Sequence, residues 1–255
     1  MTDASPRPQT VLVTGAAKRI GRAIALDMAK AGFAVAVHHH ESRNEAADLV
    51  AEIEAVGGRA IALEADLTRD AENLVARAVK ELGPIGCLIN NASRFIVDEF
   101  ATATRESWDL NLETNLRAPF MLTQSFAALL PQNAQGAVIN IVDQRVWNLT
   151  PYFTSYTVSK VGLWALTQTS ALALAPRIRV NAIGPGPVLP SPRQTQEQFD
   201  KQCRAMPLQR GAELFEICAA VRFILACPSM TGQLITLDGG QHLGWAQARG
   251  VIAEE

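Results

Sequence analysis

The stretch Thr-Val-Leu-Val-Thr-Gly-Ala-Ala-Lys-Arg-Ile-Gly, residues 10–21, decides the fold of this chain. Its first five residues are rich in β-formers, and a helical pattern runs from Ala23 to Ala31 beyond the turn. A strand, a glycine turn and a helix in this order place backbone N–H groups and a helix N-terminus against a pyrophosphate. Ala17 lies between Gly15 and Gly21, where a dinucleotide fingerprint has its second glycine. We therefore expect this turn to bind a dinucleotide.

Short apolar runs alternate with helical patterns through the rest of the chain. Further strands are expected at residues 33–37, 59–64, 86–90, 137–142, 179–183 and 233–237. Helices are expected at residues 45–56, 71–82, 107–130 and 212–226, and in a segment that carries Tyr156 and ends at Ala175. This alternation predicts an α/β fold with a parallel sheet of about seven strands, doubly wound by helices on both faces. No linker or repeat divides residues 1–255, so we expect a single domain.

The composition is that of an ordinary globular protein and excludes several classes of function. Hydrophobic residues make up 48% and charged residues 19%, and the net charge of −2 offers no general attraction to nucleic acid. The apolar runs are too short to span a membrane, and the first ten residues lack the apolar core of a signal peptide, so a cytoplasmic location is expected. Reduced, mostly buried thiols are expected at Cys87, Cys203, Cys218 and Cys227, which show no metal-ligand spacing.

The second expected strand runs into the polar sequence His-His-His-Glu-Ser-Arg at residues 38–43. An acidic residue at this strand end takes the ribose 2′-hydroxyl of NAD, whereas a basic environment accommodates the 2′-phosphate of NADP. With Lys18 and Arg19 in the neighbouring turn the balance favours NADP(H), and Glu41 argues against it. No metal site is expected from the three histidines, because consecutive strand residues point to alternate faces.

Tyr156 and Lys160 are four positions apart, so they lie on one face of their expected helix. An ammonium beside a phenol favours the phenolate and brings the phenol pKa, ordinarily about 10, toward the working range. Tyr156 can then deliver or accept a proton. Asp143 lies thirteen positions before Tyr156, at a strand end that can place its carboxylate near the phenol. Two simpler interpretations stay open: a solvated helix face for the pair, and a cap of the next segment for Asp143.

Other polar residues and one loop also suggest a site. Asn115 interrupts an otherwise apolar helical stretch, which suggests that it bridges a backbone gap or holds a water. Asp66 either caps the helix expected at residues 71–82 or lies beside an adenine ring. Residues 188–210 carry three prolines and predict a loop with a short helix that covers a site.

These motifs together resemble the short-chain dehydrogenase/reductase family. The matching pieces are Thr14-Gly15-x-x-x-Arg19-Ile20-Gly21, Asn90-Asn91-Ala92, Asn115, Tyr156-x-x-x-Lys160, Pro185-Gly186 and Asp238-Gly239-Gly240. The resemblance implies a Rossmann-type fold, with Tyr156 as general acid, Lys160 on the nicotinamide ribose and Asn115 holding a water of a proton relay. The cofactor-binding residues expected on these grounds are Gly15, Lys18, Arg19, Ile20, Gly21, His38, His40, Ser42, Asp66, Leu67, Asn91, Ala92, Ser93, Pro185 and Gly186.

One position departs from the common family pattern. Most members carry a serine thirteen residues before the tyrosine, and Asp143 in its place is similar to the pteridine reductases and dihydromonapterin reductases. Other fragments agree, namely the glycine turn, the histidine-rich strand end and residues 91–95 (Asn-Ala-Ser-Arg-Phe). By this resemblance Phe95 stacks on a pterin over the nicotinamide, and Arg19 and Ser93 contact cofactor phosphate and pterin.

The leading hypothesis is therefore NADPH-dependent reduction of a pterin or dihydropterin C=N bond, with Tyr156 as proton donor and Asp143 hydrogen-bonded to it. A carboxylate suits accepting N–H donors or relaying a proton toward a ring nitrogen. A carbonyl reductase of ketones or 3-oxoacyl groups is the alternative within the same fold, and a non-catalytic dinucleotide-binding scaffold is a second. The resemblance also implies a homotetramer built on the helices from Asn115 and Phe153, and residues from Ala246 onward are expected at the surface or in a subunit contact.

Overall fold

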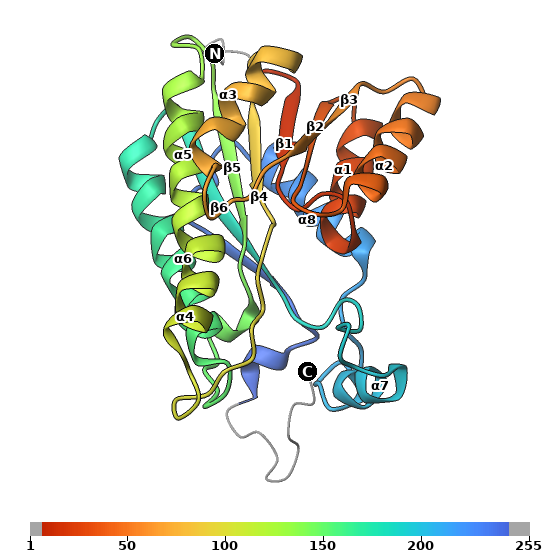
Figure 1. Cartoon of the computed structure of the whole chain (residues 1–255), viewed down its shortest axis with the longest axis vertical. Coiled ribbons are helices and arrows are strands. Elements are labelled where there is room, and N and C mark those ends of the chain that lie inside the picture. Colours follow the sequence, from red (N-terminus) through yellow and green to blue (C-terminus); the bar gives the residue numbers. More distant parts are fainter. Residues whose placement is uncertain (1–6, 245–255) are drawn as a thin grey trace.

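The computed structural model describes residues 7–244, which form helices packed on both faces of one parallel sheet (Figure 1). The strands are β1 (Thr10–Val13), β2 (Ala34–His39), β3 (Ala60–Glu64), β4 (Cys87–Asn90), β5 (Gly136–Ile141), β6 (Ile178–Pro185) and β7 (Leu234–Leu237). Their spatial order is β3-β2-β1-β4-β5-β6-β7, and every neighbouring pair is parallel. The doubly wound sheet that the sequence predicts is confirmed.

The helices divide between the two faces of the sheet. One face carries α1 (Arg19–Lys30), α2 (Arg43–Ala55) and α8 (Leu214–Ala226), and the other carries α3 (Ala71–Leu82), α4 (Arg105–Leu112), α5 (Ala118–Leu129) and α6 (Thr154–Leu174). Successive strand residues supply the two cores: Val11 and Val13 pack with α1 and α8, whereas Leu12 packs with α3 and α5. Both faces are apolar, as strands buried on two sides require.

The strand order reverses between β1 and β4, which is where a sheet of this kind binds ligands. Thr14, just after β1, ties the two strand ends together. Its hydroxyl accepts hydrogen bonds from the backbone N–H groups of Asn91 (2.9 Å) and Ala92 (3.0 Å). The glycine turn therefore lies directly beside the residues that follow β4, and α7 (Gln196–Arg204) lies beyond the same ends of the strands (Figure 1).

Most elements differ from their expected bounds by one or two residues at an end, and three of the differences bear on the site. α1 begins at Arg19 instead of Ala23, and β2 continues through His39, so that two of the three histidines are buried strand residues. The helix expected at residues 107–130 begins earlier, because Thr104 and Ser107 form a capping box, and it is interrupted by a π-helical turn at Glu113–Arg117. Such turns widen a helix locally and are frequent at functional sites.

None of the helices in residues 7–244 combines the length and apolar character needed to cross a bilayer. All four cysteines are free thiols, and Cys87, Cys203 and Cys218 are buried. Burial raises the pKa of Cys87 to about 12 and that of Cys218 to about 11, which keeps both thiols protonated. Residues from Ala246 onward lie outside the described part of the chain.

Candidate active site

The glycine turn after β1 forms one wall of a cavity of about 460 Å³. Gly15 has φ of +60°, and a Cβ added there would lie 2.9 Å from the Cα of Ala92. A Cβ at Gly21 would lie 2.2 Å from the carbonyl oxygen of Gly15. Only glycine fits at these two positions, so the turn can fold tightly and leave backbone N–H groups and the first residues of α1 along the cavity wall. This wall fits a dinucleotide pyrophosphate.

His38 lies beneath this turn and is buried. Its Nδ1 accepts a hydrogen bond from the N–H of Gly15 (2.9 Å), so its Nε2 carries the proton and donates to the carbonyl of Ala65 (3.1 Å). Burial lowers the pKa of His38 to about 4, which keeps the ring neutral near pH 7. Both ring nitrogens are occupied within the protein, so His38 holds the glycine turn against the end of β3. His38 also lines the cavity, and its contact with a cofactor stays a prediction.

The rim of this cavity carries the remaining residues expected around a 2′-phosphate. His40 is exposed, Ser42 is the N-cap residue of α2, and Glu41 points outward with 81% of its side chain exposed. Lys18 pairs with Glu45 at 2.6 Å, an exposed ion pair of the kind that contributes little and exchanges readily for a phosphate.

Asp66 and Leu67 line the same cavity beyond the end of β3. Oδ1 of Asp66 accepts hydrogen bonds from the backbone N–H (3.0 Å) and the hydroxyl (2.8 Å) of Thr68, which closes a local turn. The N-cap residue of α3 is Asp70, so the interpretation of Asp66 as that cap is wrong.

A second cavity, of about 540 Å³, continues from the first along the strand ends. Arg19, Ile20, Asn91 and Ser93 line both cavities. The side-chain amide of Asn91 donates to the carbonyls of Thr14 (2.8 Å) and Gly15 (3.1 Å), which attaches the wall between the cavities to the glycine turn. Pro185 and Gly186, at the end of β6, form part of the far wall.

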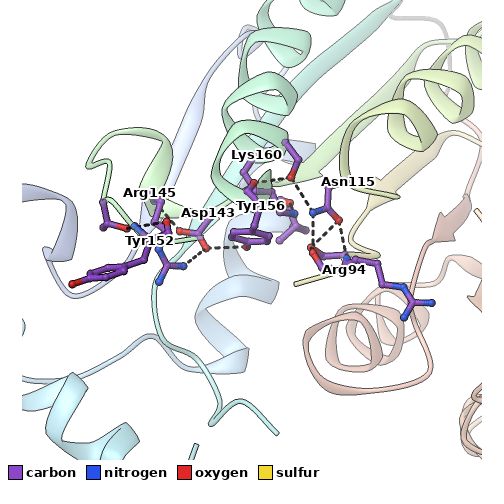
Figure 2. Close-up of polar contacts among 11 residues, drawn as sticks. Arg94, Asn115, Asp143, Arg145, Tyr152, Tyr156 and Lys160 are labelled. Carbon is purple, nitrogen blue, oxygen red and sulfur yellow. Dashed lines mark hydrogen bonds and ion pairs between the residues drawn. The ribbon is translucent and has the colours of Figure 1, made fainter. Parts of the chain in front are cut away.

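Tyr156, Lys160 and Asp143 come together in this second cavity (Figure 2). The hydroxyl of Tyr156 donates to Oδ2 of Asp143 at 3.0 Å. Lys160 donates from Nζ to the carbonyl of Ile141 at 2.9 Å and lies 5.8 Å from the centre of the tyrosine ring. Only 7% of Tyr156 and 2% of Lys160 are exposed, so the interpretation as a solvated helix face is wrong.

The two carboxylate oxygens of Asp143 perform different tasks. Oδ1 accepts from the backbone N–H of Arg145 (2.8 Å) and caps the short 3₁₀ turn at Gln144–Val146, while Oδ2 faces Tyr156 and the guanidinium of Arg145 (3.3 Å). The capping and the catalytic interpretations are therefore compatible. Arg145 was not singled out by its sequence pattern, although its position two residues after an acid is a signal. Its guanidinium lies 4.9 Å from the centre of the Phe153 ring.

Burial is the main influence on the pKa of Lys160. Removal from water lowers the pKa of this ammonium to about 8, and the carboxylate of Asp143 opposes that shift. Near pH 7 the group is therefore still largely protonated, and a cation lies beside the phenol. This is the arrangement that the spacing of Tyr156 and Lys160 predicts.

Asn115 lies in the π-helical turn and is fully buried. Its side-chain oxygen accepts from the hydroxyl of Ser93 (3.1 Å) and the N–H of Arg94 (2.8 Å), and its nitrogen donates to the carbonyl of Arg94 (2.9 Å) and the hydroxyl of Ser159 (3.0 Å). All four hydrogen-bonding positions of the amide are filled. Asn115 thus bridges the segment after β4 to α6, and a side-chain contact with a relay water stays a prediction.

The start of α6, which carries Tyr156, is held by Asp98 from a loop far away in sequence. Oδ1 of Asp98 accepts from the N–H of Ser155 (3.0 Å), and Oδ2 accepts from the hydroxyls of Ser155 (2.5 Å) and Ser107 (2.8 Å). Asp98 is 3% exposed, so this network is buried. No sequence pattern identified it, because the acid and the helix that it caps are 57 residues apart.

Phe95 forms an aromatic wall of the second cavity beside the phenol. Its ring contacts that of Tyr156 edge to face, with centroids 4.5 Å apart, and that of Phe153 at 4.9 Å. Within residues 7–244, no group of His, Cys, Asp and Glu side chains is placed to hold a metal ion. The glycine turn, the buried phenol of Tyr156 and the aromatic wall of Phe95 therefore lie along two adjoining cavities.

Comparison with known proteins agrees with this arrangement. The family model "short chain dehydrogenase" matches residues 9–201. The 3-oxoacyl-[acyl-carrier-protein] reductase FabG of Staphylococcus epidermidis is 30% identical over 242 residues, covering 92% of this chain and 99% of that protein. The corresponding reductase of Synechocystis is 31% identical over 238 residues, covering 91% and 96%.

Solved structures are more similar still. FolM alternative dihydrofolate reductase 1 from Brucella suis, in complex with NADP, is 47% identical with a TM-score of 0.92, covering 96% of this chain and 98% of that one. The Brucella canis protein of the same name, complexed with NADP, is 46% identical with a TM-score of 0.93, covering 98% and 99%. With the matched family model and the shared fold and motifs, this chain belongs to the short-chain dehydrogenase/reductase family of oxidoreductases.

Proposed function

We propose that this chain is an NADPH-dependent reductase of a pterin or dihydropterin C=N bond. The observation that carries the proposal is the hydrogen bond between Tyr156 and Asp143 in a cavity that Phe95 also lines. A buried acid, a carboxylate acceptor and an aromatic wall suit a flat heterocycle that has both N–H donors and a ring nitrogen to protonate. The similarity to FolM alternative dihydrofolate reductases supports the same substrate class.

The first cavity fits the adenosine and pyrophosphate parts of NADPH. The glycine turn and the start of α1 would hold the pyrophosphate, and Lys18, His40 and Ser42 at the rim would receive the 2′-phosphate. Asp66 and Leu67 would lie beside the adenine, with Ser93, Pro185 and Gly186 farther along the cleft. NADPH, when bound, supplies the hydride. The two Brucella structures contain NADP. A blue fluorescent protein from a metagenomic library, 30% identical to this chain, was solved with NADPH.

Tyr156 would deliver the proton to the substrate nitrogen. The loss of that proton leaves a phenolate, which the ammonium of Lys160 stabilises from nearby. The guanidinium of Arg145 offsets the charge of the adjacent Asp143. Asp143 aligns the hydroxyl in the resting site. When the hydroxyl turns toward a substrate, Oδ2 becomes available to accept an N–H of the heterocycle.

Reduction of a 3-oxoacyl group is the second candidate, because the FabG relatives are 30–31% identical to this chain. Two features of the site favour the pterin. A carboxylate at position 143 repels the lone pairs of a neutral carbonyl that a hydroxyl would polarise. The cavity lining also offers amide and hydroxyl side chains that can hydrogen-bond to the many donors and acceptors of a pterin: Gln144, Ser191, Gln194, Gln202 and Gln241.

A substrate panel tests the proposal directly. NADPH oxidation would be followed with dihydrobiopterin, dihydrofolate, biopterin, simple ketones and an acetoacetyl thioester, for the wild type and for Tyr156→Phe. We expect turnover of at least one pterin, with kcat reduced at least about 100-fold in Tyr156→Phe and NADPH affinity within about twofold, because only the proton donor is lost. Turnover of ketones or the thioester alone would refute the pterin assignment. Tight NADPH binding without turnover of any compound would favour a scaffold.

A further inference from the structure

Arg193 lies at the mouth of the second cavity and has no role in the proposed reaction. It belongs to the segment between β6 and α7 and lines the same cavity as Asp143 and Tyr156. Its guanidinium donates to the carbonyl of Phe95 at 2.9 Å and lies 5.5 Å from the centre of the Phe95 ring. Arg193 therefore spans the cleft and rests on the aromatic wall.

The charges that line this cavity are strongly unbalanced. The charged lining residues are Arg19, Arg145, Lys160, Arg193 and one acid, Asp143. The acid is already shared between Arg145 and Tyr156, and Lys160 is turned toward the carbonyl of Ile141. In the described part of the chain, Arg193 makes no ion pair with a carboxylate. One of its five N–H donors meets a neutral carbonyl, so its charge is available to a ligand.

The burial of the three side chains Tyr156, Phe95 and Arg193 indicates how a substrate would lie in the cavity. Tyr156 is buried, Phe95 is half-buried and Arg193 is exposed, in that order along the aromatic contacts. The side chain of a dihydropterin is attached to the carbon of the C=N bond that is reduced, so it begins near Tyr156. A side chain long enough to reach the mouth of the cavity then passes Phe95 and Arg193. A substituent with a carboxylate would meet the guanidinium there, and a bidentate pair is the geometry that arginine favours.

We propose that Arg193 is a specificity-determining residue that selects pterins whose side chain carries a carboxylate, over pterins with a neutral side chain. The inference rests on the proposed function and names the substrate class more narrowly. The opposing interpretation is that Arg193 only holds its loop in place. Arg19 does so from the glycine turn, where it donates to the carbonyl of Leu189 at 3.2 Å.

Two substrates that differ in charge separate these interpretations. Dihydrofolate carries the carboxylates of its glutamate, whereas dihydrobiopterin has an uncharged side chain. Arg193→Gln retains an N–H donor for the carbonyl of Phe95 and loses the charge, and Arg193→Lys retains the charge and loses the planar fork. Arg204→Gln, on the neighbouring helix α7 and outside the cavity lining, is the matched control for loss of one positive charge.

We expect Arg193→Gln to raise KM for dihydrofolate about tenfold while kcat and KM for dihydrobiopterin stay within about twofold. Arg193→Lys should lie between wild type and Arg193→Gln, and Arg204→Gln should match the wild type. Equal losses with both substrates would assign Arg193 to loop positioning, and no change with either would remove it from recognition. If the wild type turns over neither pterin, the proposed function fails and this inference with it. Turnover of both by the wild type with no selective effect of Arg193→Gln refutes the inference alone.

Discussion

At the scale of single residues, the carboxylate of Asp143 distinguishes this site from one with a serine. One of its carboxylate oxygens caps the 3₁₀ turn, which is a structural role, and the other accepts the hydrogen bond of Tyr156, which is a chemical role. A serine hydroxyl can also cap the 3₁₀ turn, since serine is as good an N-cap residue as aspartate. It cannot supply a second, ionised oxygen to the phenol and to the buried guanidinium of Arg145.

Asp143→Ser should therefore depress pterin reduction more than cofactor affinity. We expect kcat/KM for the pterin to fall roughly 10- to 100-fold, in the range of a lost hydrogen bond to a charged group, with the Kd for NADPH changed by less than about threefold. Steady-state kinetics and a fluorescence titration with NADPH measure the two quantities. Asp143→Asn is the control of similar shape that removes only the charge. A parallel loss of turnover and cofactor affinity in both variants would mean that Asp143 acts through the fold alone.

Lys160 makes both activity and stability depend on pH. Because its pKa in the folded protein is about 8, the ammonium beside Tyr156 is lost as pH rises through 8, and kcat should decline there. Stability changes in the opposite sense. Between pH 8 and the ordinary lysine pKa of 10.5 the unfolded chain binds more protons than the folded one, so this group adds stability as pH rises, by up to about 3 kcal/mol.

The comparison of wild type with Lys160→Met isolates this contribution. Urea unfolding at pH 7.5 and pH 9.5 should show that the wild type gains stability relative to Lys160→Met at the higher pH. The pH profile of kcat for the wild type supplies the second readout. If the difference in unfolding free energy between the two proteins is the same at both pH values, Lys160 does not titrate in this window.

At the scale of elements, the chemistry depends on where α6 begins. Phe153 precedes the helix in a left-handed conformation (φ +59°), and Asp98 binds the first turn from a separate loop. Tyr156 follows within that turn. The position of the phenol therefore rests on a buried polar network and not on helix propensity.

Asp98→Ala should displace the first turn of α6 and leave the first cavity, which Asp98 does not line, unchanged. The substitution leaves the N–H and the hydroxyl of Ser155 without their acceptor, which costs on the order of 1–3 kcal/mol of unfolding free energy, whereas the hydroxyl of Ser107 keeps the carbonyl of Thr104. We expect kcat to fall about tenfold or more, since small displacements of a reacting group are costly, while NADPH affinity is retained. Asp98→Asn keeps one acceptor and should lie in between. Chemical denaturation and kcat are the measurements, and a stable Asp98→Ala variant with full kcat would contradict this account.

The elements also show how far the sequence alone reaches. Strand and helix alternation predicts the sheet, and the spacing of Tyr156 and Lys160 predicts their shared helix face, because both follow from local periodicity. The π-helical turn at Asn115 and the cap from Asp98 depend on contacts between distant segments, which no local pattern records. The hydrogen bonds that join His38 to Gly15 and Ala65 likewise connect segments that are distant in sequence.

At the scale of the whole molecule, apolar side chains remain exposed on two neighbouring helices. On α5 these are Phe120 (44% exposed) and Leu129, and on α6 they are Val158, Val161 and Leu172. Because exposed apolar area of this kind is typical of interaction sites, we predict that these side chains form one. Since most soluble oligomers are symmetric assemblies of one chain, a second copy of the same surface is the natural partner, in keeping with the homotetramer that the family resemblance implies.

The assembly can be measured directly. Four chains of 27.5 kDa give about 110 kDa, which we expect from light scattering of the purified protein. Phe120→Glu places a charge in the shared surface and should reduce the mass to that of a dimer or monomer, because an unpaired charge is not tolerated in a buried interface. Val56→Glu, at an exposed apolar residue just after α2 and away from α5 and α6, is the control and should leave the mass unchanged. A wild-type mass near 27.5 kDa would exclude the tetramer, and an unchanged mass for Phe120→Glu would place the interface elsewhere on the molecule.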